Sequence, residues 1–507
     1  MKIKYVPIRY ITAISVMLVE IAAVIGGVIA LCFHSPVFAL AAVVTHAICV
    51  VTIIASDDNP DYKVPWLFFV LTLPIVGFML YLMFYSRRLK RKFINRMKAV
   101  DIMTRYEKED GDELCRLACE DPDACAQARM IMKIADTHIF ENTLQEYFPL
   151  GDGVMEPMLS DLESAEKFIY VEYFIIEKGL LWDSILEILK RKVAEGVDVK
   201  LIYDDVGCML TLPGNYYRKL RRIGIGATPF SMLTGTVDSK FNNRSHRKIM
   251  VIDGRVGYTG GINLADEYIN RIEKHGHWKD TAIRLEGEAV RELTRLFMID
   301  YGINVRRLPE LSENLFPKVG VKARDGFLIP FGDGPSPIYR RRVGKTVIQN
   351  LINGAREYVY MTTPYLIIDN ELCSCIENAA LRGVDVRILL PHIPDKRIIF
   401  TMTRSYYKRL LDAGVRIFEY EPGFLHAKTY LADGKTAMLG TVNLDYRSLV
   451  HHFENGVWIY RSSVIHDIKS DIDSTLEKCI EIDPKNMKRG PLSSALSSVV
   501  RIFSPLL

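Results

Sequence analysis

Three long runs of apolar residues open the chain and contrast with everything that follows them. Ile11 to Phe33 contains a single charged residue, Glu20, and its 23 residues are long enough as a helix to cross a hydrocarbon core of about 30 Å. Val37 to Ser56 is a second such run, and Trp66 to Tyr85 is a third, which contains one proline and one glycine. Both residues are tolerated in membrane helices more readily than in soluble ones. The pattern therefore predicts three membrane-spanning helices, at about 11–33, 37–56 and 66–85.

Further along the chain, the pattern of apolar and polar positions repeats once. An apolar stretch rich in aromatic residues, 168–176, is followed by a helical stretch and then by the sequence GVDVKLIY from Gly196. The same order recurs with 358–368 and with GVDVRILL from Gly383, which follows Gly196 by 187 residues. Strands that alternate with helices predict an α/β fold, and a repeat of this length predicts duplicated domains.

The predicted organisation has four parts. A membrane anchor with a basic stretch at its end occupies 1–98, and 99–155 is polar and largely helical in pattern, which predicts a helical connector. Two α/β domains are expected at 156–330 and 331–507.

Charge is distributed as unevenly as hydrophobicity. The first 85 residues hold four basic and four acidic side chains, whereas 87–98 hold seven basic ones and no acidic one, in a chain of net charge +4. Because the excess of basic side chains lies in this one short segment next to the apolar runs, the charge pattern disfavours a nucleic-acid binder and favours contact with an anionic bilayer. The basic residues after the third run also place the large C-terminal part in the cytoplasm. Because three crossings would then put Lys2, Lys4 and Arg9 outside, the number and orientation of the first spans stay open.

The nine cysteines do not form a recognisable framework. Their odd number and scattered spacing favour reduced thiols in a cytoplasmic domain. Cys115, Cys119 and Cys125 with His138 match no common zinc-site spacing, so no metal is predicted.

The most specific signal is a pattern of chemical residues that occurs twice. In the first copy His246-x-Lys248 is followed by Asp253 and then by Gly260-Gly261-x-Asn263. The second copy begins 180 residues later and consists of His426, Lys428, Asp433 and Gly440-Thr441-x-Asn443. With each fixed residue at roughly one position in twenty, only about one histidine in 10⁵ would carry this pattern by chance.

The spacing favours phosphate chemistry. Histidine and lysine two apart on a strand project to the same face and are able to address one phosphate together. Asn263 and Asn443 are candidate donors to a phosphate oxygen. Asp253 and Asp433 precede a glycine at the expected hairpin turn, so both are candidates for direct chemistry but are better explained as turn formers.

Two histidines are able to hold the two protonation states that the reaction needs at the same time, which one histidine cannot do. Nucleophilic attack needs a neutral imidazole, whereas protonation of a leaving group needs an imidazolium. Asp280 follows the first motif and Glu454 the second, and we treat them as candidate orienting carboxylates, with ordinary surface acids as the alternative.

These residues resemble the phospholipase D superfamily, in which two H-x-K-x4-D motifs meet in one active site, and within it the bacterial cardiolipin synthases. The segments that carry the resemblance are GGINLADEY, HWKDT, TTPY, GTVNLDYRS, the Asn59-Pro60 region and the final RIFSPLL. Two departures stand out. His452 occupies a position before Phe-Glu where the family usually has Asn, and the apolar N-terminus holds one more span than the usual two.

The resemblance implies a multi-pass cell-membrane enzyme without cofactor or metal that makes cardiolipin from two molecules of phosphatidylglycerol. It implies that His246 attacks phosphorus to form a phosphohistidine, while His426 acts as acid and then as base. Lys248, Lys428, Asn263 and Asn443 would stabilise the phosphoryl oxygens. The alternatives are a phospholipase D-type hydrolase, a phosphatidyltransferase that uses another alcohol, and a membrane scaffold with a degenerate enzyme fold.

Overall fold

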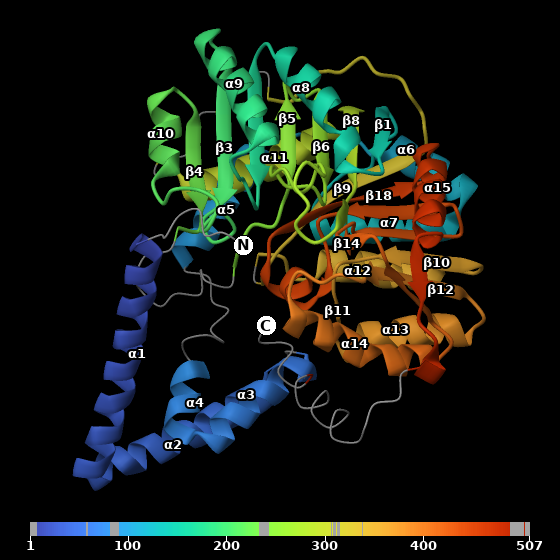
Figure 1. Cartoon of the computed structure of the whole chain (residues 1–507). Coiled ribbons are helices and arrows are strands. Elements are labelled where there is room, and N and C mark those ends of the chain that lie inside the picture. Colours follow the sequence, from blue (N-terminus) through green and yellow to red (C-terminus); the bar gives the residue numbers. More distant parts are fainter. Residues whose placement is uncertain are drawn as a thin grey trace.

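The computed structural model describes residues 8–56, 59–81, 91–232, 243–305, 307, 311, 315–336, 338–486 and 501. In these ranges the chain forms a group of N-terminal helices that stands away from two α/β domains (Figure 1).

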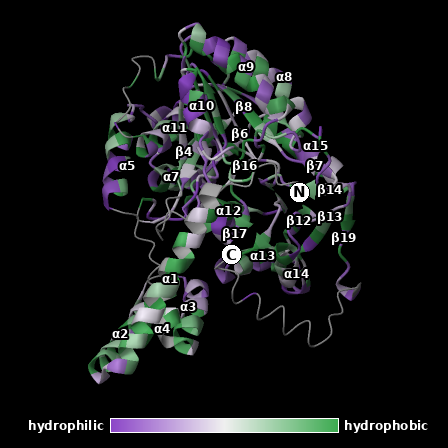
Figure 2. Cartoon of the chain, turned by 60° about the vertical axis from the view of Figure 1, so that its left-hand side comes forward, coloured by the Kyte–Doolittle hydropathy of each residue, from purple (hydrophilic) through white to green (hydrophobic). Residues whose placement is uncertain are grey.

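The first two apolar runs form two long helices. α1 (Ile8–His34) and α2 (Pro36–Ala55) are separated by Ser35, and Pro36 occupies a first helical position, where its missing N–H costs nothing. Among the described residues α2 is the one helix that is long and apolar enough to cross a membrane, and a shorter apolar stretch, Ile21–His34, lies within α1. Figure 2 shows these helices as a largely hydrophobic arm outside the body of the protein.

The third apolar run differs from the single helix predicted at 66–85. It forms α3 (Pro60–Thr72) and α4 (Pro74–Leu80), which are separated at Leu73. The break falls directly before Pro74, which has no backbone N–H to continue the hydrogen-bond ladder of α3. α4 folds back against α3 so closely that a side chain on Gly77 would lie 2.1 Å from the carbonyl oxygen of Phe69. Residues 82–85 of the predicted span lie outside the described residues.

Two sheets form the centres of the α/β domains. The first has the strand order β1-β8-β6-β5-β2-β3-β4, with β1 (Thr143–Phe148), β2 (Phe168–Tyr173), β3 (Asp198–Asp204), β4 (Gly226–Phe230), β5 (Ile249–Ile252), β6 (Val256–Gly260) and β8 (Ala282–Gly287). The second has the order β19-β13-β12-β10-β15-β16-β18-β9, with β9 (Phe327–Asp333), β10 (Tyr358–Thr362), β12 (Asp385–Pro391), β13 (Arg416–Tyr420), β15 (Thr429–Ala432), β16 (Thr436–Gly440), β18 (Glu454–Tyr460) and β19 (Cys479–Glu481).

The two sheets have the same topology, which is what a duplicated domain requires. Strands β4-β3-β2-β5-β6-β8-β1 correspond in order to β13-β12-β10-β15-β16-β18-β9, and β19 is an addition at the edge. β2 pairs with β3 in parallel and with β5 in antiparallel orientation, and β10 pairs with β12 and β15 in the same two ways. The predicted α/β class and the predicted repeat are therefore confirmed.

Two predicted boundaries need correction. β1 lies inside the predicted connector at 99–155 but is the edge strand of the first sheet, where it pairs with β8. β9 crosses the predicted boundary between 330 and 331, yet its whole length pairs with β18 of the second sheet. An edge strand that lies far in sequence from the rest of its sheet has no local pattern that assigns it to a domain.

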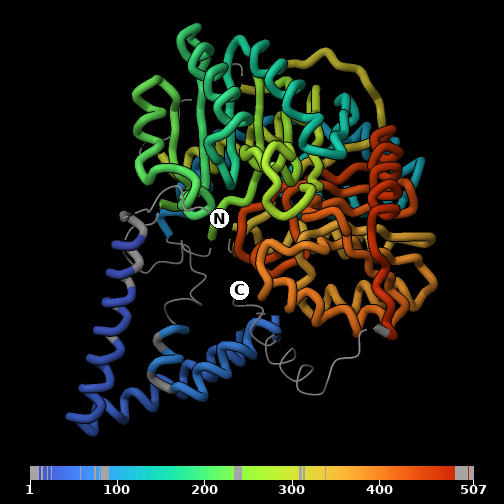
Figure 3. Tube along the Cα trace, viewed as in Figure 1, coloured from blue at the N-terminus to red at the C-terminus, as the bar shows by residue number. Residues whose placement is uncertain are grey.

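The remaining helices cover the sheets and join the two domains. The connector contributes α5 (Arg91–Met103), α6 (Gly111–Glu120) and α7 (Pro122–Ala135). The first domain adds α8 (Met155–Glu163), α9 (Leu180–Ala194), α10 (Tyr216–Arg222) and α11 (Val290–Asn304), and the second adds α12 (Val343–Gly354), α13 (Asn370–Leu381), α14 (Arg397–Asp412) and α15 (Val464–Leu476). α5 packs on α11, whereas α7 packs on α12 and β9. In Figure 3 the teal α6–α7 segment accordingly lies beside the orange and red second domain.

The domains share an interior. One cluster of buried side chains contains Tyr170 and Ile249 from the first sheet together with Leu425 and Phe453 from the second domain. Two short strands, β7 (His277–Lys279) and β14 (Gly423–Leu425), pair in parallel across the boundary. The C-terminal helix α15 also packs on β1 of the first domain. The two domains therefore form one body.

The N-terminal arm contacts the second domain through the start of α3. The side chain of Asn59 donates to Asp369 at 2.9 Å, and Asp61 accepts from the backbone N–H of Asn370 at 2.7 Å. The ring of Tyr62 lies 5.2 Å from that of Tyr446. We call these interactions the anchor contact.

Candidate active site

The first histidine motif lies in an extended segment that leads into β5. His246 and Lys248 are 7% and 1% exposed. The backbone N–H of His246 donates to the carbonyl oxygen of Phe453 at 2.8 Å, and Ser245 and Phe453 form a parallel β-bridge. A segment of the second domain therefore holds the first histidine in place.

The second motif is held by a segment of the first domain. His426 and Lys428 lie between β14 and β15, and both are buried. The backbone N–H of His426 donates to the carbonyl oxygen of Lys279, in the first domain, at 2.7 Å. Each histidine is thus positioned by main chain from the other half of the repeat.

The candidate orienting carboxylates are exchanged between the domains. Nδ1 of His246 lies 3.0 Å from both carboxylate oxygens of Glu454, and Nδ1 of His426 lies 2.5 Å from Oδ2 of Asp280. The sequence singles out both acids because they follow the two motifs, and the structure brings each to the histidine of the opposite motif. With Nδ1 engaged, Nε2 is the nitrogen left for chemistry on each ring.

The small residues after each hairpin fit these carboxylates. A side chain on Gly261 would lie 1.9 Å from Oδ1 of Asp280, so only glycine leaves room for that acid. In the second copy Thr441 takes the equivalent place, and its hydroxyl donates to Glu454. Ser448 donates to the same carboxylate at 2.5 Å. Both oxygens of Glu454 therefore accept hydrogen bonds while it faces His246.

Burial sets the protonation of the two histidines. It lowers the pKa of His246 to about 3 and that of His426 to about 4, and the facing carboxylates oppose this effect only in part. The pKa of Glu454 is lowered despite its burial, mainly because His246 faces it. Both imidazoles are therefore neutral near pH 7 while the site contains no substrate.

The two lysines lie close enough to influence each other. Burial, followed by the charge of Lys428, lowers the pKa of Lys248 to about 7, and burial lowers that of Lys428 to about 8. Lys248 donates to the carbonyl oxygen of His246 at 2.8 Å, and Nζ of Lys428 lies 2.8 Å from Nδ1 of His426. Two ammonium groups buried together favour the binding of an anion between them.

The two asparagines are already engaged within the protein. Asn263 accepts from the N–H of Ile175 at 3.0 Å and donates to the hydroxyl of Tyr268 at 2.7 Å. Asn443 donates to Asp445 at 2.9 Å, while its Oδ1 is buried without a partner among the described residues. Each amide keeps only one further N–H for a phosphate oxygen.

The two aspartates of the motifs contact backbone at the far end of the hairpins. Asp253 accepts from the N–H groups of Glu166, Lys167 and Phe168 at 2.8 Å each. Asp433 accepts from the N–H groups of Arg356, Glu357 and Tyr358, the first residue of β10, at 2.8 to 2.9 Å. Both adopt a positive φ, 53° and 51°, as the turn requires. These contacts favour the turn-forming interpretation over direct chemistry.

Sequence reasoning missed the buried ion pairs around the first motif. Arg244 pairs with Asp204 at 2.9 Å, and Arg247 pairs with Asp300 at 3.0 Å. Ser245 donates to Glu172 at 2.6 Å. The two arginines flank His246 in the sequence, but the second motif has no counterpart, so the repeat gives no signal for them.

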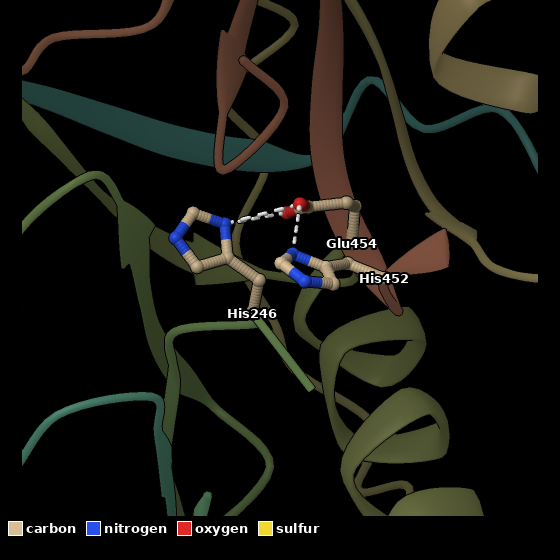
Figure 4. Close-up of side chains that lie close together, drawn as sticks. All are labelled: His246, His452 and Glu454. Carbon is tan, nitrogen blue, oxygen red and sulfur yellow. Dashed lines mark hydrogen bonds and ion pairs between the residues drawn. The ribbon is translucent and has the colours of Figure 1, made fainter. Parts of the chain in front are cut away.

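One cluster offers possible metal ligands. The ligating atoms of His246, His452 and Glu454 lie within 4.8 Å of one another (Figure 4). The cysteines considered above are arranged differently, because Cys125 is buried whereas Cys115 and Cys119 are exposed, and His138 pairs with Asp110 at 2.6 Å.

Comparison with known proteins gives a consistent result. The family described as cardiolipin synthase, phospholipase D-like domain, matches residues 158–297 and 348–476, and a phospholipase D-nuclease N-terminal family matches 46–84. An uncharacterised protein of Streptococcus mutans is 40% identical over 88% of this chain and 96% of its own. The cardiolipin synthase of Alkalihalophilus pseudofirmus is 34% identical over 92% of this chain and 94% of its own.

A solved structure shares the fold. The phosphatidylserine synthase of Haemophilus influenzae aligns with a TM-score of 0.56 and 15% identity, over 75% of this chain and the whole of that one.

Proposed function

Because the chain belongs to the cardiolipin synthase family with phospholipase D-like domains, we propose that it transfers a phosphatidyl group from one phosphatidylglycerol to another, giving cardiolipin and glycerol. The observation that carries this proposal is the exchange of His–carboxylate pairs between the two domains, His246 with Glu454 and His426 with Asp280. The exchange supports one site with two histidines rather than two separate sites.

In the first step Nε2 of neutral His246 attacks phosphorus. A phosphorus–nitrogen bond forms, and the bond from phosphorus to the oxygen of the headgroup glycerol breaks. Burial keeps His246 in the neutral form that attack requires. When the phosphodiester anion binds, its charge and that of Asp280 stabilise the imidazolium form of His426, which takes up a proton from solvent. His426 then gives this proton to the departing oxygen.

In the second step His426, now neutral, takes the proton from a headgroup hydroxyl of the second phosphatidylglycerol. The hydroxyl oxygen attacks phosphorus, the phosphorus–nitrogen bond breaks, and His246 returns to its starting state. Lys248 and Lys428 stabilise the charge on the phosphoryl oxygens through both steps.

The apolar N-terminal helices support a place in the cell membrane. We propose a multi-pass anchor that leaves the two α/β domains in the cytoplasm, where an anionic lipid surface supplies both substrates. The bilayer keeps the acceptor lipid at high local concentration, which favours transfer over hydrolysis. Cysteines that are all free thiols fit this compartment.

The test is lipid product analysis with the purified full-length protein in phosphatidylglycerol vesicles. We expect cardiolipin and free glycerol, and no product from the His246→Ala plus His426→Ala variant. Release of phosphatidic acid without cardiolipin would replace the synthase by a hydrolase. A phosphatidyl adduct trapped on His426 in a His246→Ala background would reverse the roles of the two histidines.

A further inference from the structure

Lys279 is a buried lysine that directly precedes Asp280, one of the two exchanged carboxylates. It is 5% exposed, and its Nζ donates to the two oxygens of Asp471 at 2.8 and 2.7 Å and to the carbonyl oxygen of Pro149. An ammonium group has three hydrogens, so all three have acceptors within the protein. Tyr147 also donates to Asp471, at 2.7 Å. Lys279 is therefore fully engaged in a structural contact and is not placed to bind substrate.

The main chain of the same residue holds the second histidine. The carbonyl oxygen of Lys279 accepts from the N–H of His426 at 2.7 Å and from that of Ala427 at 3.2 Å. The carboxylate of the next residue, Asp280, lies 2.5 Å from Nδ1 of His426. The backbone and the ring of His426 thus both depend on where Lys279 lies.

The short strand that contains Lys279 has little other support. β7 belongs to neither large sheet and pairs with β14 in a sheet of two strands. Such a pairing is only marginally stable by itself. Asp471, in contrast, lies on α15, which packs on β1 of the first domain and on β13 and β15 of the second. Figure 1 shows this red helix at the junction of the two domains.

α15 therefore supports both partners of the His426–Asp280 contact. It packs on β15, the strand that follows His426, and through Asp471 it holds the strand that leads to Asp280. The ion pair crosses the boundary between the domains, as the His–carboxylate contact does. A proton-transferring histidine works only while its partners stay within hydrogen-bond reach, and a small displacement lowers the rate strongly.

The first histidine is held by other groups. His246 faces Glu454, and its N–H donates to the carbonyl oxygen of Phe453. Neither contact involves β7 or α15. Loss of the Lys279–Asp471 ion pair should therefore affect proton transfer by His426 and leave attack by His246 intact.

We propose that Lys279 and Asp471 are positioning residues, whose ion pair across the domain boundary holds Asp280 against His426 and so sustains proton transfer by that histidine. This inference rests on the proposed function.

A double variant removes the ion pair without leaving a buried charge unpaired. In Lys279→Met plus Asp471→Asn both charges are lost, and the asparagine keeps an acceptor for Tyr147. The matched control is Lys469→Met plus Asp473→Asn, the same two changes in a more exposed ion pair on the same helix. Lys279→Arg is the conservative variant, because a guanidinium also pairs with a carboxylate. Circular dichroism gives the folded fraction of each purified full-length protein.

Two lipids separate proton transfer from attack. Phosphatidylglycerol in vesicles reports the whole reaction as cardiolipin. In the second lipid p-nitrophenol replaces the headgroup glycerol. Attack by His246 forms the phosphorus–nitrogen bond, and the phosphorus–oxygen bond breaks with its electron pair on nitrophenolate, which leaves without a proton from His426. The rate of nitrophenolate release in the first turnover therefore reports attack alone.

We expect the Lys279→Met plus Asp471→Asn variant to form cardiolipin roughly 100-fold more slowly than the wild type, with first-turnover nitrophenolate release within about threefold of it. His426→Ala should show the same contrast between the two lipids. Lys279→Arg should form cardiolipin within about tenfold of the wild-type rate. The Lys469→Met plus Asp473→Asn control should match the wild type with both lipids.

Three results would overturn the positioning role. The first is a wild-type rate of cardiolipin formation in the Lys279→Met plus Asp471→Asn variant. The second is an equal fall with both lipids in folded protein, which would mean a general structural role. The third is a rate in Lys279→Arg as low as in the double variant. All three leave cardiolipin formation by the wild type intact. Absence of cardiolipin from the wild type, or loss of nitrophenolate release in His426→Ala, would instead overturn the proposed function.

Discussion

At the scale of single residues, the exchanged carboxylates make each histidine depend on the other domain. In Glu454→Gln and Asp280→Asn the negative charge that stabilises the imidazolium is lost while the side-chain shape stays. We expect cardiolipin formation to fall roughly 10²- to 10⁴-fold in each, as measured by initial rates in phosphatidylglycerol vesicles. Glu187→Gln, at an exposed position on α9, is the matched control and should keep the wild-type rate. Rates near the wild type in both site variants would remove the orienting role.

The two lysines predict a pH dependence for anion binding. Lys248 and Lys428, with pKa values lowered to about 7 and about 8, are charged at pH 6 and largely neutral at pH 9. An anion binds best to the charged form, so affinity is highest at low pH and falls as the pH rises. For sulfate, whose charge is constant over this range, we expect the Kd from calorimetry to rise roughly tenfold or more between pH 6 and pH 9. The Lys248→Met variant should show a flatter profile, and an unchanged wild-type Kd would contradict the prediction.

Much of the candidate site follows from the sequence because its pattern occurs twice. The repeat singles out the histidines and lysines that the structure buries together, and Asp280 and Glu454 stand at similar places after the two motifs. Which carboxylate faces which histidine depends on how the domains pack, and linear spacing contains no information on that. Arg247 was not predicted for a different reason: it has no equivalent in the second motif, so the repeat does not single it out.

At the scale of secondary-structure elements, the motif aspartates stabilise hairpins. Asp253→Ala removes the acceptor for the N–H groups of residues 166–168, which lead into β2, and also strains the backbone at a φ of 53°. We expect a loss of about 2 kcal/mol in the free energy of unfolding and an unchanged rate per folded molecule. Asp253→Asn keeps one acceptor and tolerates the positive φ, so its loss should be smaller. Denaturant titration with parallel rate measurements distinguishes the two roles. A stable but inactive Asp253→Ala protein would assign the aspartate to chemistry.

Elements that the sequence predicts well have a strong local pattern. The strands at β2 and β10 and the helix α2 are of this kind. The third apolar run has the composition of a membrane helix, but Pro74 breaks it and Gly77 allows α4 to fold back on α3. The packing of α4 on α3 is a tertiary contact, and the periodicity of apolar residues does not predict it.

At the scale of the whole molecule, two exposed cysteines test the proposed orientation. Cys115 and Cys119 are exposed on α6, whereas the other seven cysteines are buried or partly buried. With the α/β domains in the cytoplasm, a membrane-impermeant maleimide should leave the protein unlabelled in intact cells and label it after permeabilisation. The Cys115→Ser plus Cys119→Ser variant is the control, and labelling in intact cells would reverse the topology.

The anchor contact has a consequence for the order in which the enzyme is made. Asn59 and Asp369 are 310 residues apart, so the ribosome completes the apolar arm long before the surface on which its end will rest. Chains emerge from the N-terminus, and domains fold as they appear. With the proposed membrane anchor, the second α/β domain folds after the arm has inserted, and Tyr62 then meets Tyr446 beside the bilayer. On this order of synthesis, we expect the anchor contact to be the last part of the fold to form.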